Sequence, residues 1–493
     1  MGPMGRCESL PTPTSLVLLG ATGDLARKKL LPALYDLYVA RALPERFHVV
    51  AFSRDALSEN EYRTFVRTHA TERARTKDHT HLDDFATCFT YVQGSFDDRA
   101  AFGRIKEALE TQDTRIGICA SKLFYLAVPP SFYDTIFEQI AHTRLDLPCT
   151  MGEGWVRILV EKPFGSDLDH ARKLEDKLSV LFKEEQIYRI DHYLAKDALQ
   201  NILAFRFSNV LFEDQWNKDF VEAVYIRLFE QFDVGTRGAF FDGVGALRDV
   251  GQNHMLQMLA LIAMERPDAL NADALRSRRA EVLHTLRIPK KEDVGTTIIK
   301  GQYRGYLDTK DVATDSKTET YFALKTYLDD PRWEGVPFYL EHGKAMRENL
   351  GDITVRFRSA THCVCGETEA HEHPNFVRFS LSPEQKITLR FWVRKPGAKY
   401  ELLPEDLVFD RHKALSMRGG AVVTDAYEEV LCDALCGDQT LFVSSAEQSA
   451  AWEYVTAVLG VWHDQAPVVY DKNSEGPDSD LIREAHEQMT LSS

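Results

Sequence analysis

The chain has 493 residues, of which 44% are hydrophobic and 27% charged, and its formal net charge is −16 at pH 7. This length exceeds the usual size of one domain, so we expect two domains. The negative charge argues against broad nucleic-acid binding, and the longest apolar stretch, around Leu256–Met264, is far too short to span a bilayer. We therefore expect neither nucleic-acid nor membrane partners, while a local group of cations can still bind a small anionic ligand.

Residues 1–14 have no apolar core like that of a secretory signal, and we expect them to form a flexible tail. The eight cysteines are scattered through a large chain and do not form the dense framework of a small secreted domain. This usage predicts reduced thiols in a cytoplasmic protein.

Residues 15–190 alternate short apolar runs with helical patterns, which predicts an α/β domain with a mostly parallel sheet covered by helices. The runs expected to form strands are Ser15–Leu19, Phe47–Phe52, Phe89–Val92, Leu123–Ala127, Val156–Val160 and Gln186–Ile190. The segments expected to form helices are Leu25–Ala40, Glu59–Thr71, Arg99–Glu110, Ser131–Ala141 and Asp169–Leu181.

The pattern changes after about residue 200, and we expect residues 191–493 to form a larger α+β domain. Its candidate strands follow one another without a helix between each pair, which predicts a predominantly antiparallel sheet. These strands are Val221–Glu230, Ile353–Ser359, Phe376–Leu381 and Lys386–Trp392. Further helices are expected at Asn253–Met264 and Glu447–His463.

A glycine loop follows the first predicted strand at once, with the spacing Gly-x-x-Gly-x-x-Ala. Strand, glycine loop and helix in this order are typical of a Rossmann-type dinucleotide site, because glycine lets the backbone approach a pyrophosphate and the helix N-terminus offers N–H groups. We expect the cofactor-binding residues of this loop to be Gly20, Thr22, Gly23, Asp24 and Leu25. The alternative is a glycine turn that only opens an ordinary helix.

The second predicted strand is followed by Arg54, where an NAD enzyme usually carries Asp or Glu to bind the ribose 2′-hydroxyl. A carboxylate would repel a 2′-phosphate, whereas a guanidinium can bind one through paired hydrogen bonds. This difference favours NADP as the cofactor. Asp55 follows directly, so some use of NAD stays open, and the alternative for Arg54 is a solvated cation after a strand.

Lys162, between Glu161 and Pro163, follows the fifth predicted strand. Ligands bind at this end of the strands in a parallel sheet. Lys162 can contact a substrate hydroxyl or the nicotinamide carboxamide, and a cis bond before Pro163 is compatible with the sequence. The alternative is a surface lysine at a strand end.

The sixth predicted strand is followed by Asp191, His192 and Tyr193, with Lys196 three residues later. An imidazole, a phenol and an ammonium group are three donors for a phosphate dianion, which needs several charge-assisted hydrogen bonds to offset its desolvation. We therefore expect His192, Tyr193 and Lys196 to bind a phosphate. The alternative is that His192 and Tyr193 are hydrogen-bonded core residues.

His254 is a candidate general base, because an imidazole accepts a proton at physiological pH. A carboxylate on its other ring nitrogen would fix the tautomer and stabilise the imidazolium, and Asp249 and Asp191 are both candidates for that partner. Spacing alone does not choose between them, and His254 can equally be a packed residue at a helix start.

In this order, the motifs resemble the glucose-6-phosphate dehydrogenase family over about residues 15–462. The segments that carry the resemblance are GATGDLARKKLLPALYDL, EKPFG, RIDHYLAK with QNILAFRF, GAFFDGVGALRDVGQNHMLQ and DAYEEVLCDALCGDQTLF. The resemblance implies a Rossmann-type domain followed by a larger domain built on a predominantly antiparallel sheet, and a homodimer or dimer of dimers formed through that sheet.

The resemblance also implies residue roles for the oxidation of glucose 6-phosphate at C1 by NADP, the first step of the oxidative pentose phosphate pathway. His254 would take the proton from the C1 hydroxyl while Asp191 orients it. The product would be 6-phospho-D-glucono-1,5-lactone. The substrate-binding set would be Lys162, His192, Tyr193, Lys196, Glu230, Asp249 and Lys344, and the cofactor-binding set would include Arg54 and Lys162.

The chain departs from the family pattern at two positions near these residues. Ala195 replaces a glycine, which would strain the backbone if the position required a positive φ angle. Lys344 matches a family substrate lysine, but the second cation of that segment falls on the neutral Asn349, and Arg347 is a possible substitute. Affinity for the sugar phosphate is therefore an open question.

Cys363, Cys365, His371 and His373 have metal-ligand residue types, although their Cys-x-Cys spacing is tighter than that of a zinc knuckle. We expect a polar hairpin tip here and no metal.

Two other functions remain as alternatives: a Rossmann oxidoreductase that acts on an unphosphorylated sugar or polyol, and a non-catalytic NADP-binding sensor. The phosphate-binding residues argue against the first, and the complete catalytic set argues against the second.

Overall fold

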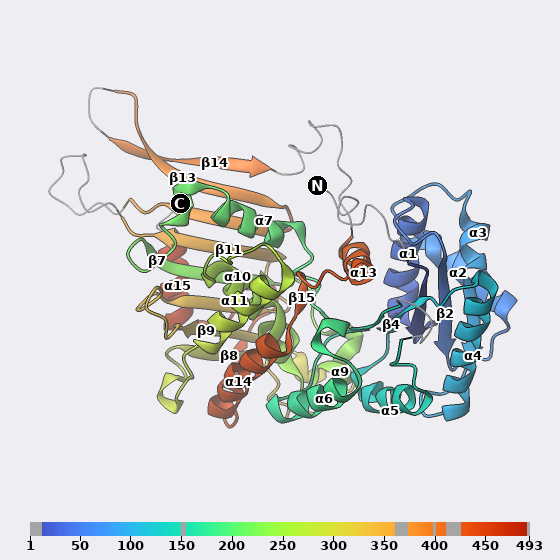
Figure 1. The fold of residues 1–493 in the computed structure, drawn as a ribbon. Helices are drawn as coiled ribbons and strands as arrows, with labels where there is room; N and C mark the ends of the chain where they lie inside the picture. Colours follow the sequence, from blue (N-terminus) through green and yellow to red (C-terminus); the bar gives the residue numbers. More distant parts are fainter. Residues whose placement is uncertain (1–11, 149–153, 360–372, 398–400, 411–424, 491–493) are drawn as a thin grey trace. The chain divides into compact units, whose positions relative to one another are not determined.

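The computed structural model describes residues 12–148, 154–359, 373–397, 401–410 and 425–490 (Figure 1). The chain forms two compact units. Unit 1 contains the chain up to Ala195 together with Asn271–Arg276 and Val422–Ser445, and unit 2 contains the rest. We had expected everything after residue 190 to lie in the second domain. Residues 191–195 and the two short later segments belong instead to unit 1.

Unit 1 is built on a seven-stranded sheet with the order β15-β6-β5-β4-β1-β2-β3. All neighbouring strands are parallel except β15, which pairs antiparallel with β6. The order reverses between β1 and β4, which is the position where open parallel sheets bind ligands. The strands are β1 (Thr14–Leu19), β2 (Phe47–Ser53), β3 (Phe89–Gln93), β4 (Ser121–Leu126), β5 (Val156–Val160), β6 (Ile187–Ile190) and β15 (Phe442–Val443).

Helices cover both faces of this sheet, which explains why its central strands are apolar throughout. In β1, Leu16 and Leu18 pack with α1 (Leu31–Val39) and α2 (Glu59–Glu72). Val17 and Leu19 point the other way, toward the helices of the opposite face. The remaining helices are α3 (Leu82–Thr87), α4 (Arg99–Ile116), α5 (Tyr133–Thr143), α6 (Leu168–Leu181) and α13 (Ala426–Cys436).

The late segment of unit 1 completes it at two places. The helix α13 packs against α1, and β15 adds an antiparallel strand to the free side of β6. Arg157 of β5 donates hydrogen bonds to the carbonyl groups of Ala434 and Leu435 at 2.7 and 2.8 Å. These contacts join residues nearly 300 positions apart, which explains why local pattern did not assign the segment to this domain.

Unit 2 is built on a nine-stranded sheet with the order β14-β13-β12-β11-β7-β10-β9-β8-β16. Only the pairs β7–β10 and β8–β16 are parallel, so the sheet is predominantly antiparallel as expected. Its strands are β7 (Val221–Phe229), β8 (Ile298–Tyr303), β9 (Tyr321–Thr326), β10 (Phe338–Gly343), β11 (Leu350–Phe357), β12 (Phe376–Ser382), β13 (Lys386–Arg394), β14 (Leu402–Asp410) and β16 (Val468–Tyr470).

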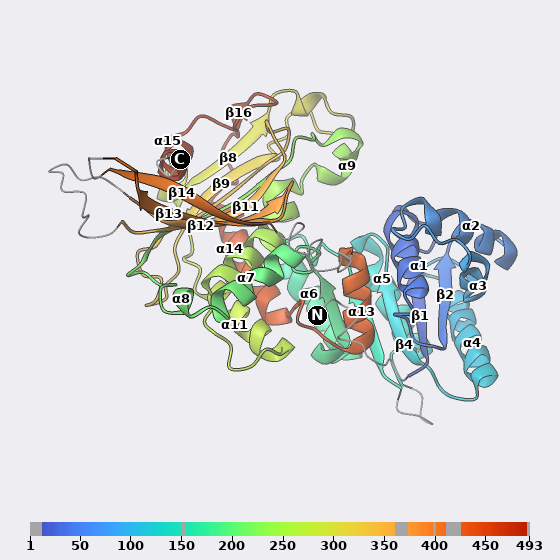
Figure 2. The same ribbon diagram turned by 90° about the horizontal axis from the view of Figure 1, so that it is seen from above.

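Helices of unit 2 lie on both faces of its sheet: α15 on one face, and α7, α11 and α14 on the other (Figure 2). A buried ion pair joins α11 to α14, with Arg279 Nε 2.6 Å from Glu447 Oε1. The helices are α7 (Asp197–Phe207), α8 (Val210–Glu213), α9 (Gly238–Phe241), the π-helix η6 (Leu247–Met255), α10 (Leu256–Ala263), α11 (Ala272–His284), α14 (Ser445–Trp462) and α15 (Asp480–Thr490).

Two predictions about the chain ends and thiols need correction. Thr14, expected in the tail, is the buried first residue of β1, and the part of the tail before residue 12 lies outside the described residues. Cys119 and Cys436 are disulfide-bonded, whereas Cys88 and Cys432 are not part of a disulfide. Scattered positions in sequence did not exclude disulfides, because folding brings distant segments together. The cytoplasmic location stays a prediction.

The cluster considered for metal binding lies outside the described residues except for His373. The His373 ring packs edge-on against Trp392 of β13, with the ring centroids 4.4 Å apart. Within the described ranges, no three His, Cys, Asp or Glu side chains are arranged to hold a metal ion.

Candidate active site

The glycine loop of unit 1 lies between the carboxyl ends of β1, β2 and β4. The Gly20 and Ala21 N–H groups donate to the Phe52 carbonyl oxygen at 2.9 and 3.1 Å, which ties the loop to β2. Gly20 has φ +88°, and a Cβ atom there would lie 2.4 Å from the Ala127 carbonyl oxygen after β4. Only glycine fits this position, and the resulting backbone cradle suits a pyrophosphate.

The helix after the loop starts with the π-helical turn η2 (Ala26–Leu30), which continues into α1. Thr22 and Leu25 are half-buried and Gly23 donates to the Gly20 carbonyl oxygen at 3.0 Å, so the predicted loop residues are all brought together. Asp24 is exposed, and hydrogen bonds from Lys28 lower the pKa of its carboxyl. The helix N-terminus therefore offers its N–H groups beside a carboxylate that is already engaged by lysine.

Arg54 is exposed directly after β2, with its guanidinium 5.9 Å from the centre of the Phe132 ring. Within the described part of the chain it makes no ion pair, so its charge is available to a ligand. The preceding Ser53 is buried, and its hydroxyl lies 2.7 Å from the Tyr91 hydroxyl. Tyr91 also donates to the Asp55 backbone carbonyl at 2.6 Å, which fixes the turn that carries Arg54.

A buried carboxylate that the sequence reading passed over follows β5. Glu161 accepts a hydrogen bond from the Tyr125 hydroxyl at 2.7 Å, and its backbone carbonyl accepts one from Tyr133 at 2.8 Å. Burial alone would raise the pKa of Glu161, but the nearby His192, Tyr125 and Lys162 outweigh it and lower that pKa. Lys162 itself is half-buried, and the Lys162–Pro163 bond is cis.

The strand β6 runs parallel to β5, so the residues that follow both strands meet at one edge of the sheet. Asp191 is buried and accepts the Tyr193 N–H at 2.9 Å. His192 Nε2 lies 3.7 Å from Glu161 Oε1, and the His192 ring packs 4.5 Å from the ring of Tyr427 in α13. The structure thus brings Asp191, His192 and Tyr193 together and adds Tyr427, whose distance in sequence hid it.

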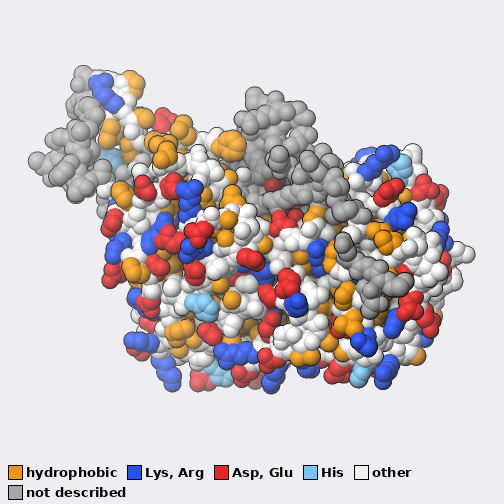
Figure 3. Space-filling model, viewed as in Figure 1, with side chains coloured by type: hydrophobic (Ala, Val, Ile, Leu, Met, Phe, Trp, Pro, Cys, Tyr) orange, Lys and Arg blue, Asp and Glu red, His pale blue; other side chains and the backbone are white. Residues whose placement is uncertain are grey.

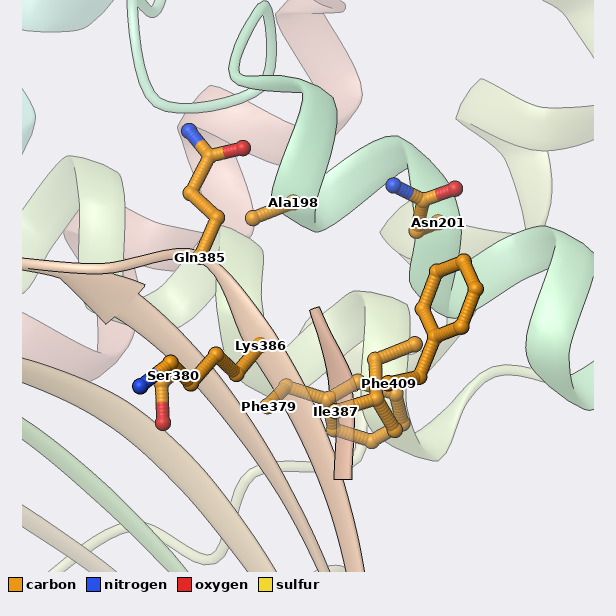
Figure 4. A pocket seen from close by; sticks show the side chains of 8 residues that line it. All are labelled: Ala198, Asn201, Phe379, Ser380, Gln385, Lys386, Ile387 and Phe409. Atoms are coloured by element: carbon orange, nitrogen blue, oxygen red, sulfur yellow. The ribbon is translucent and has the colours of Figure 1, made fainter. Parts of the chain in front are cut away.

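Lys196 stands at the N-cap of α7 in unit 2. Figure 4 shows Ala198 and Asn201 of α7 facing Phe379 and Phe409 of the sheet, around a space of only about 10 Å³. A space this small holds no ligand, so it is a packing contact that fixes α7 and, with it, Lys196. Ala195 does not have a positive φ angle, so its methyl group causes none of the strain considered from the sequence.

Lys344, Glu230 and Asp249 form a charged cluster on the sheet of unit 2. Lys344 is 1% exposed, with Nζ 2.6 Å from Glu230 Oε2 and 3.6 Å from Asp249 Oδ2. Burial would raise the pKa of Glu230, but the neighbouring His342 and Lys344 outweigh it and lower that pKa. Two carboxylates around one buried ammonium are suited to binding several hydroxyl groups of a sugar.

His254 lies in the π-helix η6, where we had expected an α-helix starting at Asn253. Backbone hydrogen bonds in a π-helix join residues five apart, so Asp249 and His254 stand one turn from each other. His254 is buried. Gly251 lets the helix approach β9, since a Cβ atom there would lie 3.0 Å from Phe322 Cζ. Single π-turns are frequent at functional sites.

His342 of β10 is a second histidine in this region, and the sequence reading missed it. Its Nδ1–H donates to the Leu228 carbonyl oxygen at 2.5 Å. Burial lowers the pKa of His342 to about 4, so the imidazole is neutral near pH 7. A neutral ring leaves Lys344 as the permanent positive charge beside Glu230.

The segment after Lys344 does not supply a second cation to this cluster. Arg347 is exposed and pairs with Glu475 at 3.0 Å, and the Asn349 side chain accepts the Gln231 N–H at 2.9 Å. Ala345 adopts φ +55°, and its N–H donates to the Phe232 carbonyl oxygen at 3.0 Å, so a strained backbone turn fixes Lys344. Lys344 is therefore the cation that this segment contributes.

Comparison with known families decides the identity. The model of the "Glucose-6-phosphate dehydrogenase, NAD binding domain" matches residues 17–201, and that of the "Glucose-6-phosphate dehydrogenase, C-terminal domain" matches residues 203–489. The chain belongs to the glucose-6-phosphate dehydrogenase family. It is therefore an oxidoreductase with a domain for a nicotinamide cofactor.

Individual relatives are similar in sequence to this protein over nearly the whole chain. "Glucose-6-phosphate 1-dehydrogenase 2" of Mycobacterium tuberculosis is 37% identical over 489 residues, covering 97% of this chain and 94% of the relative. The Borreliella burgdorferi "Glucose-6-phosphate 1-dehydrogenase" is 34% identical over 472 residues, covering 94% and 95%. The ranges matched by the two family models contain every predicted site residue.

Solved structures of the glucose-6-phosphate dehydrogenase family share this fold. One, a "Glucose-6-phosphate dehydrogenase in complex with its substrate glucose-6-phosphate", superposes with a TM-score of 0.87 at 30% identity and covers 97% of both chains. The enzyme from Mycobacterium avium gives 0.80 at 30% identity, covering 95% of this chain and 96% of its own. Among the described residues, no helix combines the length and apolarity needed to cross a membrane.

Proposed function

We propose that this protein oxidises D-glucose 6-phosphate at C1 to 6-phospho-D-glucono-1,5-lactone, the first step of the oxidative pentose phosphate pathway. NADP supplies the hydride acceptor. The observation that carries the proposal is the buried Lys344 ammonium held between Glu230 and Asp249, in a cluster that includes part of the π-helix of His254, in a chain of this family. Such a cluster binds hydroxyl groups next to a base.

In this proposal, Arg54 selects NADP over NAD. The guanidinium has no protein ion pair in the described residues and lies after β2, where the ribose 2′-position is bound in Rossmann folds. Gly20, Thr22, Gly23, Asp24 and Leu25 would hold the pyrophosphate. Replacing Arg54 with alanine should weaken NADP about tenfold or more and NAD by less than twofold. Equal losses for both cofactors would refute this role.

His192, Tyr193 and Lys196 would bind the 6-phosphate, and Lys162, Glu230, Asp249 and Lys344 the sugar hydroxyls. Support for the first set comes from three donor types in five residues after β6. Lys196→Met should raise the KM for glucose 6-phosphate about tenfold or more, because a charge-assisted contact to phosphate is lost. The KM for NADP should not change. An unchanged KM for the sugar phosphate would exclude Lys196 from the phosphate site.

His254 would act as the general base and Asp191 would orient it. The base takes the proton of the C1 hydroxyl as hydride leaves C1, and the carboxylate stabilises the resulting imidazolium. His254→Asn should lower kcat at least about 10³-fold with nearly unchanged substrate binding. Asp191→Asn should lower kcat without adding to the His254→Asn loss in the double variant, since coupled residues act as a unit. Additive losses would refute the coupling.

Initial rates test the whole proposal. Nicotinamide reduction is followed with glucose 6-phosphate and either NADP or NAD, and free glucose serves as the control. The expected result is rapid reduction of NADP that requires the phosphate group. Turnover of free glucose without turnover of the phosphate would favour a polyol or sugar oxidoreductase. Cofactor binding without turnover would favour a sensor.

We also propose that two copies associate through the nine-stranded sheet. Its edge hairpin β13–β14 exposes apolar side chains, among them Leu407 at 61% and Phe409, and hydrophobic atoms are visible beside this hairpin at the upper left of Figure 3. Such an edge is usually covered or paired. Leu407→Glu should shift the mass measured by light scattering from dimer to monomer. Val180→Glu, at an exposed site in α6, is the control and should not.

A further inference from the structure

Unit 2 contains a cavity of about 310 Å³ that none of the proposed substrate or cofactor residues lines. Its walls come from β8, the segment before β9, the π-helix η6 and the end of α14. This volume lies at the lower end of the range for small-ligand sites. We call it the Lys300 cavity, after the lysine of β8 in its wall.

The lysine is the unusual feature of the cavity. Lys300 is only 8% exposed, yet no hydrogen bond or ion pair from the described residues reaches its ammonium group. Lys300 pairs in register with Phe322 of β9, which faces Gly251 of η6, so the lysine side chain points to the same side of the sheet. The Lys300 side chain lines the cavity, and an anion bound there would supply the partner that its partly desolvated ammonium group lacks among the described residues.

The other charges of the cavity favour an anion. Lys317 and Arg248 line it together with Lys300, giving three permanent cations against the carboxylates of Glu319 and Asp464. Glu319 is buried and accepts the Leu247 N–H at 3.0 Å, and burial raises the pKa of its carboxyl. The cations therefore exceed the available negative charge.

Burial lowers the pKa of Lys300, and Lys317 lowers it further, while Glu319 and Asp464 act in the opposite direction. The desolvation effect is the largest of these, which means that the nearby carboxylates do not fully compensate the buried charge. A dianion that contacts Lys300 and Lys317 together would relieve both the desolvation and the repulsion between the two lysines.

The cavity is also connected to the proposed sugar site through one helix. Arg248 of η6 lines the cavity and donates to the Val244 carbonyl oxygen at 3.0 Å, while the next residue, Asp249, belongs to the Lys344 cluster. His254 stands later in the same π-helix. A ligand that contacts Arg248 therefore contacts the element that carries the proposed base.

We propose that the Lys300 cavity is a second anion site, which binds a phosphate dianion either free or as the monoester of a small metabolite. The recognising groups are the Lys300 and Lys317 ammonium groups and the Arg248 guanidinium. This site is distinct from His192, Tyr193 and Lys196 and goes beyond the proposed function. A phosphate bound there would contact Arg248 and so influence the conformation of η6, the helix that carries Asp249 and His254.

Equilibrium dialysis of the full chain against inorganic phosphate tests the proposal, because the readout does not require turnover. The wild-type chain should bind one more phosphate than Lys300→Met, in which affinity at this site falls at least about tenfold. Lys300→Met should leave the KM for glucose 6-phosphate within about twofold and should not lower thermal stability, since it removes a partly desolvated charge that has no ion pair among the described residues. A parallel dialysis series with glycerol 2-phosphate gives the affinity of the site for a phosphate monoester. Whichever of the two ligands binds more tightly shows whether the site prefers a monoester or free phosphate.

Lys291→Met, at an exposed lysine outside the cavity, is the matched control and should bind phosphate like the wild type. Equal phosphate stoichiometry and affinity in the wild type and Lys300→Met would overturn the proposal. If Lys300→Met does not fold, the exposed Lys317→Met decides in its place. A loss of about threefold at the second site supports the proposal, and an unchanged isotherm overturns it.

Discussion

Gly20→Ala tests how strictly the cofactor loop depends on one missing side chain. The added Cβ would lie 2.4 Å from the Ala127 carbonyl oxygen and 2.8 Å from Val128 Cγ1. Ordinary contact distance requires a shift of about 1 Å. The positive φ angle costs about 1–2 kcal/mol and the overpacking a similar amount, so we expect the free energy of unfolding to fall by about 3 kcal/mol. A 1 Å displacement of the loop should lower kcat/KM about 10²-fold.

Gly103→Ala in α4 is the matched control in the same unit. A Cβ at Gly103 meets no atom within 4 Å, so alanine should stabilise the helix by about 0.5–1 kcal/mol and leave kinetics unchanged. Urea unfolding and a titration with NADP measure both variants. If Gly20→Ala unfolds at the wild-type urea concentration and binds NADP with wild-type affinity, the close approach to Ala127 is not restrictive and the reasoning is wrong.

Three further predictions follow from unit 2. Asn349→Arg supplies a cation at the position where the family resemblance implies one and should lower the KM for glucose 6-phosphate about threefold or more at constant kcat; an unchanged KM would mean that this position does not reach the phosphate. His342 has a folded pKa of about 4 against 6.5 unfolded, so wild-type stability should fall by roughly 2 kcal/mol from pH 7 to pH 5 in urea titrations, and His342→Gln should lose this part of the pH dependence. Arg279→Met leaves Glu447 without its partner in α11 and should cost about 3–5 kcal/mol, most of which Glu447→Leu in the same chain recovers; no recovery would show that the pair is not the cause.

Much of the fold could be predicted because its signals are local. A short apolar run followed by a glycine loop, as in β1 and Gly20, strongly predicts a buried strand. All six predicted parallel strands of unit 1 are present in the structure. The strands β8, β9 and β10 were missed because their side chains are buried on both faces and show no alternation. Nor does local pattern separate the π-helix around His254 from an α-helix.

The site was predictable only where its residues are close in sequence. Asp191, His192 and Tyr193 could be recognised as a group, but Tyr427 comes from α13, more than 200 residues later. Glu161 was passed over because nothing in its neighbours shows that two tyrosines donate to it. The Arg347–Glu475 pair likewise depends on a contact that sequence spacing does not reveal.

The division of the chain has a consequence for synthesis on the ribosome. Most of unit 1 comes from the first 195 residues, but it is completed by α13 and β15, which lie in a segment that ends at Ser445. A chain emerges from the ribosome N-terminus first. In the nascent chain, one side of β6 and one face of α1 therefore lack their packing partners until most of unit 2 has been translated. Unit 1 is therefore complete only after most of unit 2 has been translated, and a fragment ending near residue 195 would lack α13 and the strand that pairs with β6.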